Sequence, residues 1–394
     1  MIKIAIIGGK LQGLEAAYLS GKADMEITLI DRNQQVPARN LCTHFVCEDI
    51  TNKSPILIEE LKKVDFILPA LENEEALLAL AELSLVHGLK LAFDLAAYRI
   101  SSSKILSDQL IHEHHIPAPG YYPNCEAPFI VKPSGESGST GVSYYETAEE
   151  LEAFLKAALP GEEWVAQEFL AGKSYSIEVI GRPGNYRTYE ITELFMDDIF
   201  DCMRVTAPCD ISDALSESFS EIALRLAEIL GLKGIMDVEV IHNKGELKVL
   251  EIDARLPSQT PTAVYHASGI NMVSELADLF CTGDFSPRGG LFSSADMPLE
   301  GGFVASAAKP RSFVSYEHLK ISEGVVSAHG EHIISKAGPL KLYRNFFGAD
   351  EAITNYSPGD KSFLGTFINT AKTQEELENK RADMANQLKR IGND

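Results

Sequence analysis

The segment FIVKPSGESGSTGV, residues 129–142, carries the most information about the fold of this chain. Three apolar residues lead into Lys132, and small residues rich in glycine and serine follow. A strand of this kind would hold the lysine in place, and the loop would leave backbone N–H groups free to converge on phosphate oxygens. The order differs from a Walker loop, in which the glycines precede the lysine. The segment predicts a phosphate-binding hairpin, with a flexible surface turn as the alternative.

The composition limits the classes of protein to which the chain can belong. It has 394 residues, of which 45% are hydrophobic and 23% charged, the balance of a globular protein with two or three packed units. Its formal net charge of -22 would repel nucleic acid and anionic membranes. Any polyphosphate must therefore be held by local cations and a divalent metal ion.

The chain has the features expected of a cytoplasmic protein. It contains no run of about 18 apolar residues, and the opening MIKIAIIGG is too short in its apolar run for a signal peptide. The 6 cysteines form no C-x-x-C pair, which favours a reduced, intracellular chain. We expect neither a membrane nor a nucleic acid as a partner.

The first part of the chain alternates short apolar strands with helices. Strands are expected at 2–7, 26–30, 45–47, 66–69 and 89–93. This alternation predicts a doubly wound parallel sheet, in which ligands bind beyond the carboxyl ends of the strands.

The segment GGKLQG, residues 8–13, allows an alternative reading as a dinucleotide fingerprint, with Asp31 on a ribose. That reading would make the protein a nicotinamide-dependent dehydrogenase. It is disfavoured because the fingerprint requires glycine where Lys10 stands.

A second unit begins after the Pro-Ala-Pro-Gly breaker at 117–120. Residues 129–168 read as a small β-β-α-β lid. Further strands are expected at 175–180, 188–194, 236–242, 247–253 and 335–343, with a charged helix at 374–391. The whole chain is therefore expected to be an α/β protein.

Two of these strands form a predicted hairpin with several carboxylates on one face. Alternation places Asp237 and Glu239 together on the first strand, and Glu251, Asp253 and Arg255 together on the second. Crowded carboxylates repel unless a cation lies between them, and a set of oxygen ligands suits Mg²⁺. Either Asp237 or Asp253 could complete the ligand set. A solvated polar face with ordinary ion pairs is the alternative.

Four features occur in a set order along the chain: Lys104, Lys132 with its loop, the stretch 167–172, and the element E-x-D-x-R at 251–255. In this order the chain resembles the ATP-grasp superfamily over nearly its whole length. The resemblance implies ATP and Mg²⁺ as cofactors. It also implies an N-terminal Rossmann-like domain (1–98), a central lid domain (99–180) and a larger C-terminal α+β domain with the Mg²⁺ and ATP site (181–394).

The resemblance assigns roles to individual residues. Arg255 and Lys132 would act on the transferred phosphoryl group, and Asp253 stands where many members of the superfamily have asparagine. The ATP-binding residues would be Lys10, Lys104, Lys132, Ser137, Gly138, Ser139, Thr140, Glu168, Phe169 and Leu170. The metal ligands would be Glu239, Glu251 and Asp253.

Several longer segments are similar to one family within this superfamily. They include GGKLQGLEAAYLS (8–20), LEIDARLPSQTPTAVYHASGINM (250–272) and FFGADEAIT (346–354). These segments resemble the 3-methylornithine–lysine ligases of pyrrolysine biosynthesis. That resemblance implies ATP-dependent ligation of (3R)-3-methyl-D-ornithine, through its carboxyl group, to the ε-amine of L-lysine by way of an acylphosphate.

The two amino acids are expected at different places. Carboxylates at the strand ends of the N-terminal crevice suit a diamino acid, and the first helix N-terminus suits its carboxylate. The expected lysine-binding residues are Leu11, Gln12, Asp31, Asp49, Ile50 and Glu72. The expected ornithine-binding residues are Ser176, Glu178, Arg255 and Ser258. The pattern identifies no general base for the amine.

Two other functions remain open at this point. One is a different ATP-grasp amino-acid or dipeptide ligase of the D-alanine ligase type, whose pockets would need fewer carboxylates. The other is an amino-acid sensor without enzyme activity, which is disfavoured by the retained Glu239, Glu251 and Arg255. The superfamily resemblance also suggests a homodimer.

Overall fold

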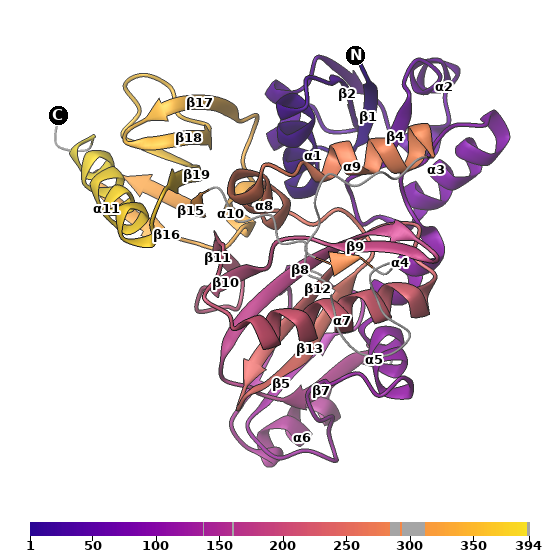
Figure 1. Cartoon of the computed structure of the whole chain (residues 1–394), viewed down its shortest axis with the longest axis vertical. Coiled ribbons are helices and arrows are strands. Elements are labelled where there is room, and N and C mark those ends of the chain that lie inside the picture. The colour runs from indigo at the N-terminus through magenta and orange to yellow at the C-terminus, as the bar shows by residue number, and fades with distance from the viewer. Residues whose placement is uncertain (137, 160, 284–291, 294–311, 392–394) are drawn as a thin grey trace.

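The computed structural model describes residues 1–136, 138–159, 161–283, 292–293 and 312–391. In Figure 1 the N-terminal sheet and the C-terminal strands lie at one end of the molecule, and the small sheet lies at the other. The long strands β8 (Lys173–Arg182) and β12 (Gly234–Asn243) run between these two ends. The α/β architecture expected from the sequence is confirmed.

The N-terminal sheet is parallel and has the strand order β3-β2-β1-β4. Its strands are β1 (Lys3–Ile7), β2 (Glu26–Asp31), β3 (His44–Cys47) and β4 (Phe66–Pro69). The helices α1 (Leu11–Lys22), α2 (Pro55–Leu61) and α3 (Glu74–His87) pack on it, with short turns η1 (Pro37–Leu41) and η2 (Ile50–Asn52). The predicted strand at 89–93 is wrong, because only Leu91 makes a bridge, to Ile67.

The small sheet is antiparallel and has the order β6-β5-β7. It contains β5 (Phe129–Pro133), β6 (Ser143–Tyr145) and β7 (Trp164–Glu168), and α6 (Ala148–Ala157) covers it. Phe129, Val131 and Leu151 form its small core. Two helices, α4 (Leu95–Ser101) and α5 (Lys104–Glu113), lead into this unit from the N-terminal domain.

The large antiparallel sheet has the main order β13-β12-β8-β10-β11-β15-β19-β18-β17. Its remaining strands are β9 (Asn185–Thr188), β10 (Thr192–Met196), β11 (Cys202–Ala207), β13 (Glu246–Asp253), β14 (Phe292–Ser293), β15 (Phe313–Ser322), β16 (Val325–Ala328), β17 (Lys341–Phe346), β18 (Ala349–Thr354) and β19 (Ser362–Ala371). Its helices are α7 (Asp213–Leu230), α8 (Thr260–Ser268), α9 (Met272–Ala277), α10 (His332–Ser335) and α11 (Gln374–Arg390), with η3 (Asp278–Thr282) after α9.

Two predicted strands of this sheet need correction. The segment 188–194 is not one strand, because residues 189–191 interrupt it between β9 and β10, which both pair with β8. The segment 335–343 is not a strand throughout, because it begins in the last residue of α10 and contains Gly338 and Pro339 before β17 starts at Lys341. Proline lacks the N–H that a sheet needs, so the strand begins after it.

The proposed division into three domains needs one adjustment. The boundary predicted at 180 cuts through β8, which pairs with β10 and β12 in the large sheet. We propose that the lid ends between Glu168 and Lys173, where the chain leaves β7 and enters β8.

A buried polar contact joins the N-terminal domain to the large sheet. The Glu15 carboxylate on α1 accepts a hydrogen bond from the backbone N–H of Thr262, 2.6 Å away, in the first turn of α8. Farther along α1, the Tyr18 hydroxyl donates to Glu351 on β18, and Lys22 forms an ion pair with the same carboxylate at 2.5 Å. These contacts fix the N-terminal crevice relative to the large sheet.

No helix in the described ranges is both long enough and apolar enough to span a bilayer. All 6 cysteines lie within those ranges, and each is a free thiol.

Replacing Gly13 in α1 tests how closely this helix approaches the first loop. A Cβ at Gly13 would lie 2.1 Å from the carbonyl oxygen of Gly8, so the backbone would have to move. We expect Gly13→Ala to lower the free energy of unfolding by about 1–3 kcal/mol, the usual cost of overpacking. The measurement is chemical denaturation.

Gly21→Ala in the same helix is the matched control. A Cβ there has no neighbour within 4 Å, and alanine favours helix, so stability should stay equal or rise by up to about 1 kcal/mol. Equal effects of the two substitutions would contradict the close approach.

Candidate active site

A cleft of about 420 Å³ separates the small sheet from the large one. Its walls combine apolar side chains with charged groups. Ile130 and Val142 come from the small sheet side, and Ile241 and Leu250 come from β12 and β13. The charged lining residues are Lys104, Lys132, Glu136, Glu168, Glu239 and Glu251. An apolar cleft that also contains two lysines suits a purine base joined to a polyphosphate.

Two lysines from different elements meet the acidic hairpin in this cleft. Lys104 opens α5, and its Nζ lies 2.9 Å from Oε1 of Glu251. This charge raises the pKa of Lys104, although burial acts in the opposite direction. Lys132 lies on β5, and burial lowers its pKa. The hairpin strand therefore holds Lys132 as the sequence predicted, beside the acids of the opposite sheet.

The glycine-rich loop covers the cleft where the predicted phosphate site lies. Gly138, Ser139 and Thr140 line the cleft, while Ser137 lies outside the described residues. The Ser139 hydroxyl donates a hydrogen bond to the backbone carbonyl of Phe200, in the turn between β10 and β11. The loop is thus connected to the large sheet as well as to its own strands.

The segment after β7 forms another wall, with Glu168, Phe169 and Leu170 all in the lining. The Glu168 carboxylate accepts a hydrogen bond from the Gly120 N–H at 2.8 Å and pairs with Lys248 at 3.1 Å. Both partners contact Oε1 of Glu168, and these contacts hold the segment in place. Contact of this segment with adenine stays a prediction.

The register of the hairpin places its acids directly opposite one another. Asp237 pairs with Asp253, and Glu239 pairs with Glu251. The sequence prediction of one acidic face is therefore confirmed. Arg255 follows the second strand, and its guanidinium lies 2.9 Å from Asp253.

Burial and mutual repulsion shape the charges of this face. Burial raises the pKa of Glu239 and of Asp237 well above their ordinary values, and neighbouring carboxylates add to the effect. Burial raises the pKa of Asp253 to about 7, although Arg255 opposes this. Burial would also raise the pKa of Glu251, but Lys104 and Lys132 outweigh it and the pKa is lowered. A divalent cation would relieve this repulsion, and the oxygen ligands fit Mg²⁺.

The N-terminal crevice connects to this site through Glu72. Its Oε1 accepts a hydrogen bond from the Gln12 side chain and lies 2.7 Å from Nε of Arg255. Gln12 and Glu72, both predicted to bind lysine, are thus linked to the arginine predicted to act on the phosphoryl group, Glu72 directly and Gln12 through Glu72.

The other residues predicted for the crevice have local partners. Asp31 accepts hydrogen bonds from the Gly9 and Asn33 N–H groups, at 2.8 and 2.7 Å. Asp49 caps η2 through Thr51, which lowers the pKa of Asp49. Ile50 is buried in the core, and Leu11 packs partly against another part of it. Lys10 is exposed at the start of α1 and does not line the 420 Å³ cleft.

A smaller cavity of about 100 Å³ adjoins the cleft and shares Gly138, Glu239 and Glu251 with it. Arg255 and Ser258, both predicted to bind ornithine, line this cavity. The other two predicted residues do not line it: Ser176 and Glu178 are each 0% exposed. The Ser176 hydroxyl donates to Asp237, and burial raises the pKa of Glu178 to about 7.

Sequence reasoning missed other residues of the smaller cavity. Gln259 and Glu331 line it, as do Met196 and Phe200. Gln259 lies inside the LPSQTPT segment, directly before a helix, and a polar residue at that position could have indicated a binding residue. Glu331 enters from beyond β16, and no local pattern marks it.

The fold and the cleft together define an ATP-grasp enzyme. Residues 101–259 match the family model of the ATP-grasp domain. The fold is shared with the biotin carboxylase of Campylobacter jejuni, solved as a β,γ-ATP complex, at a TM-score of 0.69 and 14% identity over 99% of this chain and 94% of that chain.

Two relatives identify the family within this class. The 3-methyl-D-ornithine–L-lysine ligase of Methanosarcina mazei is 39% identical over 86% of this chain and 84% of its own length. The enzyme of the same name from Methanosarcina barkeri is 34% identical over 99% of this chain and 98% of its own. The chain belongs to the 3-methyl-D-ornithine–L-lysine ligase family.

Replacing Lys132 tests the cation of the cleft. We expect Lys132→Met to lower the rate of ATP-dependent ligation at least about 100-fold, as the loss of a group that stabilises transition-state charge does. Lys244→Met, in the turn of the acidic hairpin, is the matched control and should keep its activity. A rate retained in Lys132→Met would contradict the assignment.

The raised pKa of Asp253 predicts a pH dependence of metal binding. Below its pKa of about 7 the carboxyl group holds a proton, which competes with a metal ion. We expect Mg²⁺ binding in the presence of ADP, measured by calorimetry, to weaken as the pH falls from about 8 to about 6. Asp253→Asn, which keeps an oxygen but cannot titrate, should show a shallower dependence. An unchanged pH dependence would contradict a ligand role for Asp253.

Proposed function

We propose that this chain joins 3-methyl-D-ornithine to the ε-amine of L-lysine, with conversion of ATP to ADP and phosphate, in pyrrolysine biosynthesis. The observation that carries the proposal is the match, over nearly the whole chain, to ligases of that name. The paired acids of the hairpin, with Lys104 and Lys132 facing them, support it independently because they suit phosphoryl transfer.

The reaction needs an activated carboxyl group, since a carboxylate offers no leaving group. In the proposed first step, an oxygen of the ornithine carboxylate attacks the γ-phosphorus of ATP and ADP leaves. Lys104, Lys132 and Arg255 neutralise the developing charge. Glu239, Glu251 and Asp253 would hold Mg²⁺, which supplies Lewis acidity to the phosphate oxygens. Asp237 lies opposite Asp253 and is a second candidate for this ligand set.

The second step forms the amide bond. The lysine amine must lose a proton before it attacks, because its ordinary pKa is about 10.4. It then attacks the carbonyl carbon of the acylphosphate, and the C–O bond to phosphate breaks. The amine would come from the N-terminal crevice, and we propose Leu11, Gln12, Asp31, Asp49, Ile50 and Glu72 as that site. The Glu72–Arg255 contact supports this placement because it joins the crevice to the reacting centre.

The donor site is proposed to lie in the smaller cavity, with Arg255 and Ser258 near the donor carboxylate. Ser176 and Glu178 lie behind this cavity wall. Ser176 therefore acts through its hydrogen bond to Asp237. Lys10 is exposed at the start of α1, and its proposed role is to bind a phosphate of ATP.

A D-alanine type of ligase is a weaker candidate. The smaller cavity has Asp201, Asp237, Asp253 and Glu331 around it in addition to the two glutamates shared with the cleft. One acid remains beyond the proposed metal ligands and the internally paired Asp201 and Asp237, and it suits the second ammonium group of a diamino acid, which D-alanine lacks. We also propose a cytoplasmic location, in keeping with the free cysteines, and a homodimer.

The first experiment supplies ATP, Mg²⁺, D-ornithine and L-lysine, separately and together, and follows ADP release and product mass. We expect ADP release and a condensation product only when both amino acids are present, with the new bond at the lysine ε-amine. Glu251→Ala should abolish the product. Consumption of D-alanine in place of D-ornithine would refute the proposed substrates, and ATP consumption with no amino acid product would refute the ligase.

A further inference from the structure

The smaller cavity contains one carboxylate that the proposed mechanism does not use. Among its acids, Glu239, Glu251 and Asp253 are proposed metal ligands, and Asp237 accepts a hydrogen bond from Ser176. Asp201 is paired with His332 at 2.6 Å. Glu331 is the acid that remains.

Glu331 is held by two residues of the cavity wall. Its Oε2 accepts hydrogen bonds from the Ser258 hydroxyl at 2.6 Å and from the Gln259 side chain at 2.9 Å. Its Oε1 makes no hydrogen bond to another described residue. One oxygen is thus fixed by the wall, and the other is left for a ligand.

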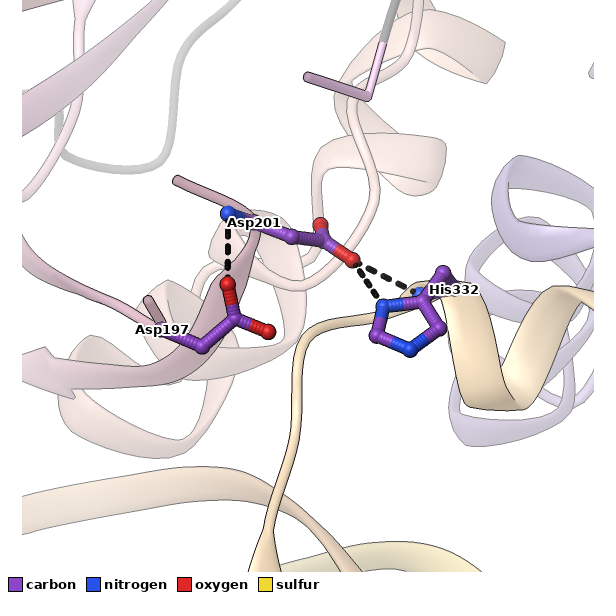
Figure 2. A group of neighbouring side chains, drawn as sticks. All are labelled: Asp197, Asp201 and His332. Carbon is purple, nitrogen blue, oxygen red and sulfur yellow. Dashed lines mark hydrogen bonds and ion pairs between the residues drawn. The ribbon is translucent and has the colours of Figure 1, made fainter. Parts of the chain in front are cut away.

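The backbone on both sides of Glu331 is anchored to the turn between β10 and β11. The Gly330 N–H donates to Asp197 at 3.0 Å, and the His332 N–H donates to Asp201 at 3.0 Å. Figure 2 shows the Asp201 carboxylate turned toward the His332 ring, with Asp197 accepting from the Asp201 backbone. These carboxylates have backbone partners, so we assign them to anchoring and not to metal binding. The close approach also requires glycine, because a Cβ at Gly330 would meet Asp201 at 2.2 Å.

We propose that Glu331 binds the side-chain ammonium group of the carboxyl donor and so selects diamino acids over monoamino acids. Ser258, Gln259 and Glu331 line the smaller cavity but not the nucleotide cleft. Gln259 and Glu331 therefore face the proposed donor cavity and not the nucleotide. A hydrogen bond between an ammonium group and a carboxylate is stronger than one between neutral groups. This inference rests on the proposed function and names the residue that recognises the carboxyl donor.

The test compares two donors that differ only in the side-chain amine, D-ornithine and D-norvaline. Their binding is measured by calorimetry with Mg²⁺ and a non-hydrolysable ATP analogue, for the native chain and for Glu331→Gln. We expect the native chain to prefer D-ornithine, and Glu331→Gln to lose about 10-fold to 100-fold of that preference, the range for a hydrogen bond to a charged group. D-norvaline binding should change little, which separates recognition from a general structural defect.

Glu323→Gln, at the exposed turn between β15 and β16, is the matched control and should keep the native preference. A preference for D-ornithine that survives in Glu331→Gln would overturn the assignment while leaving the proposed function in place. A native chain that binds D-ornithine no better than D-norvaline would refute the proposed donor itself, and the role of Glu331 with it.

Discussion

The repulsion among the buried carboxylates of the β12–β13 hairpin is the constraint on which the rest of the site depends. Asp237, Glu239, Glu251 and Asp253 face one another across two paired strands, where burial disfavours their charge. Lys104 and Lys132 outweigh this cost for Glu251, and they also favour the charged forms of Asp253 and Glu239, respectively. A bound cation would favour the charged forms of the other carboxylates, so the arrangement favours binding of a metal–nucleotide complex.

Each domain contributes to this electrostatic centre. The small sheet supplies Lys132 and the glycine-rich loop, and the loop is connected to the large sheet through Ser139 and Phe200. The N-terminal domain supplies Glu72, whose contact with Arg255 joins the crevice to the hairpin. Because α1 is fixed to α8 through Glu15 and Thr262, the crevice has a defined position relative to the reacting groups.

Features with a local pattern were predictable from the sequence. Strand alternation gave the acidic face of the hairpin, and the strand before the glycines gave Lys132. The strand carrying Ser176 and Glu178 was also predicted, and in the structure it pairs with β12. The burial of the Ser176 and Glu178 side chains was not predictable, because it depends on which distant elements cover that face of the sheet. Glu331 was missed because its place in the cavity depends on the anchoring of residues 330 and 332 to a turn far away in sequence.

The most direct test of the central claim is to follow a labelled carboxylate oxygen of the donor into phosphate. D-ornithine labelled with ¹⁸O at both carboxyl oxygens would be ligated to L-lysine, and the products would be analysed by mass spectrometry. An acylphosphate route predicts one ¹⁸O atom in the released phosphate and the other in the new amide. Phosphate without ¹⁸O, or ¹⁸O in AMP, would contradict activation of the donor by γ-phosphoryl transfer at this site.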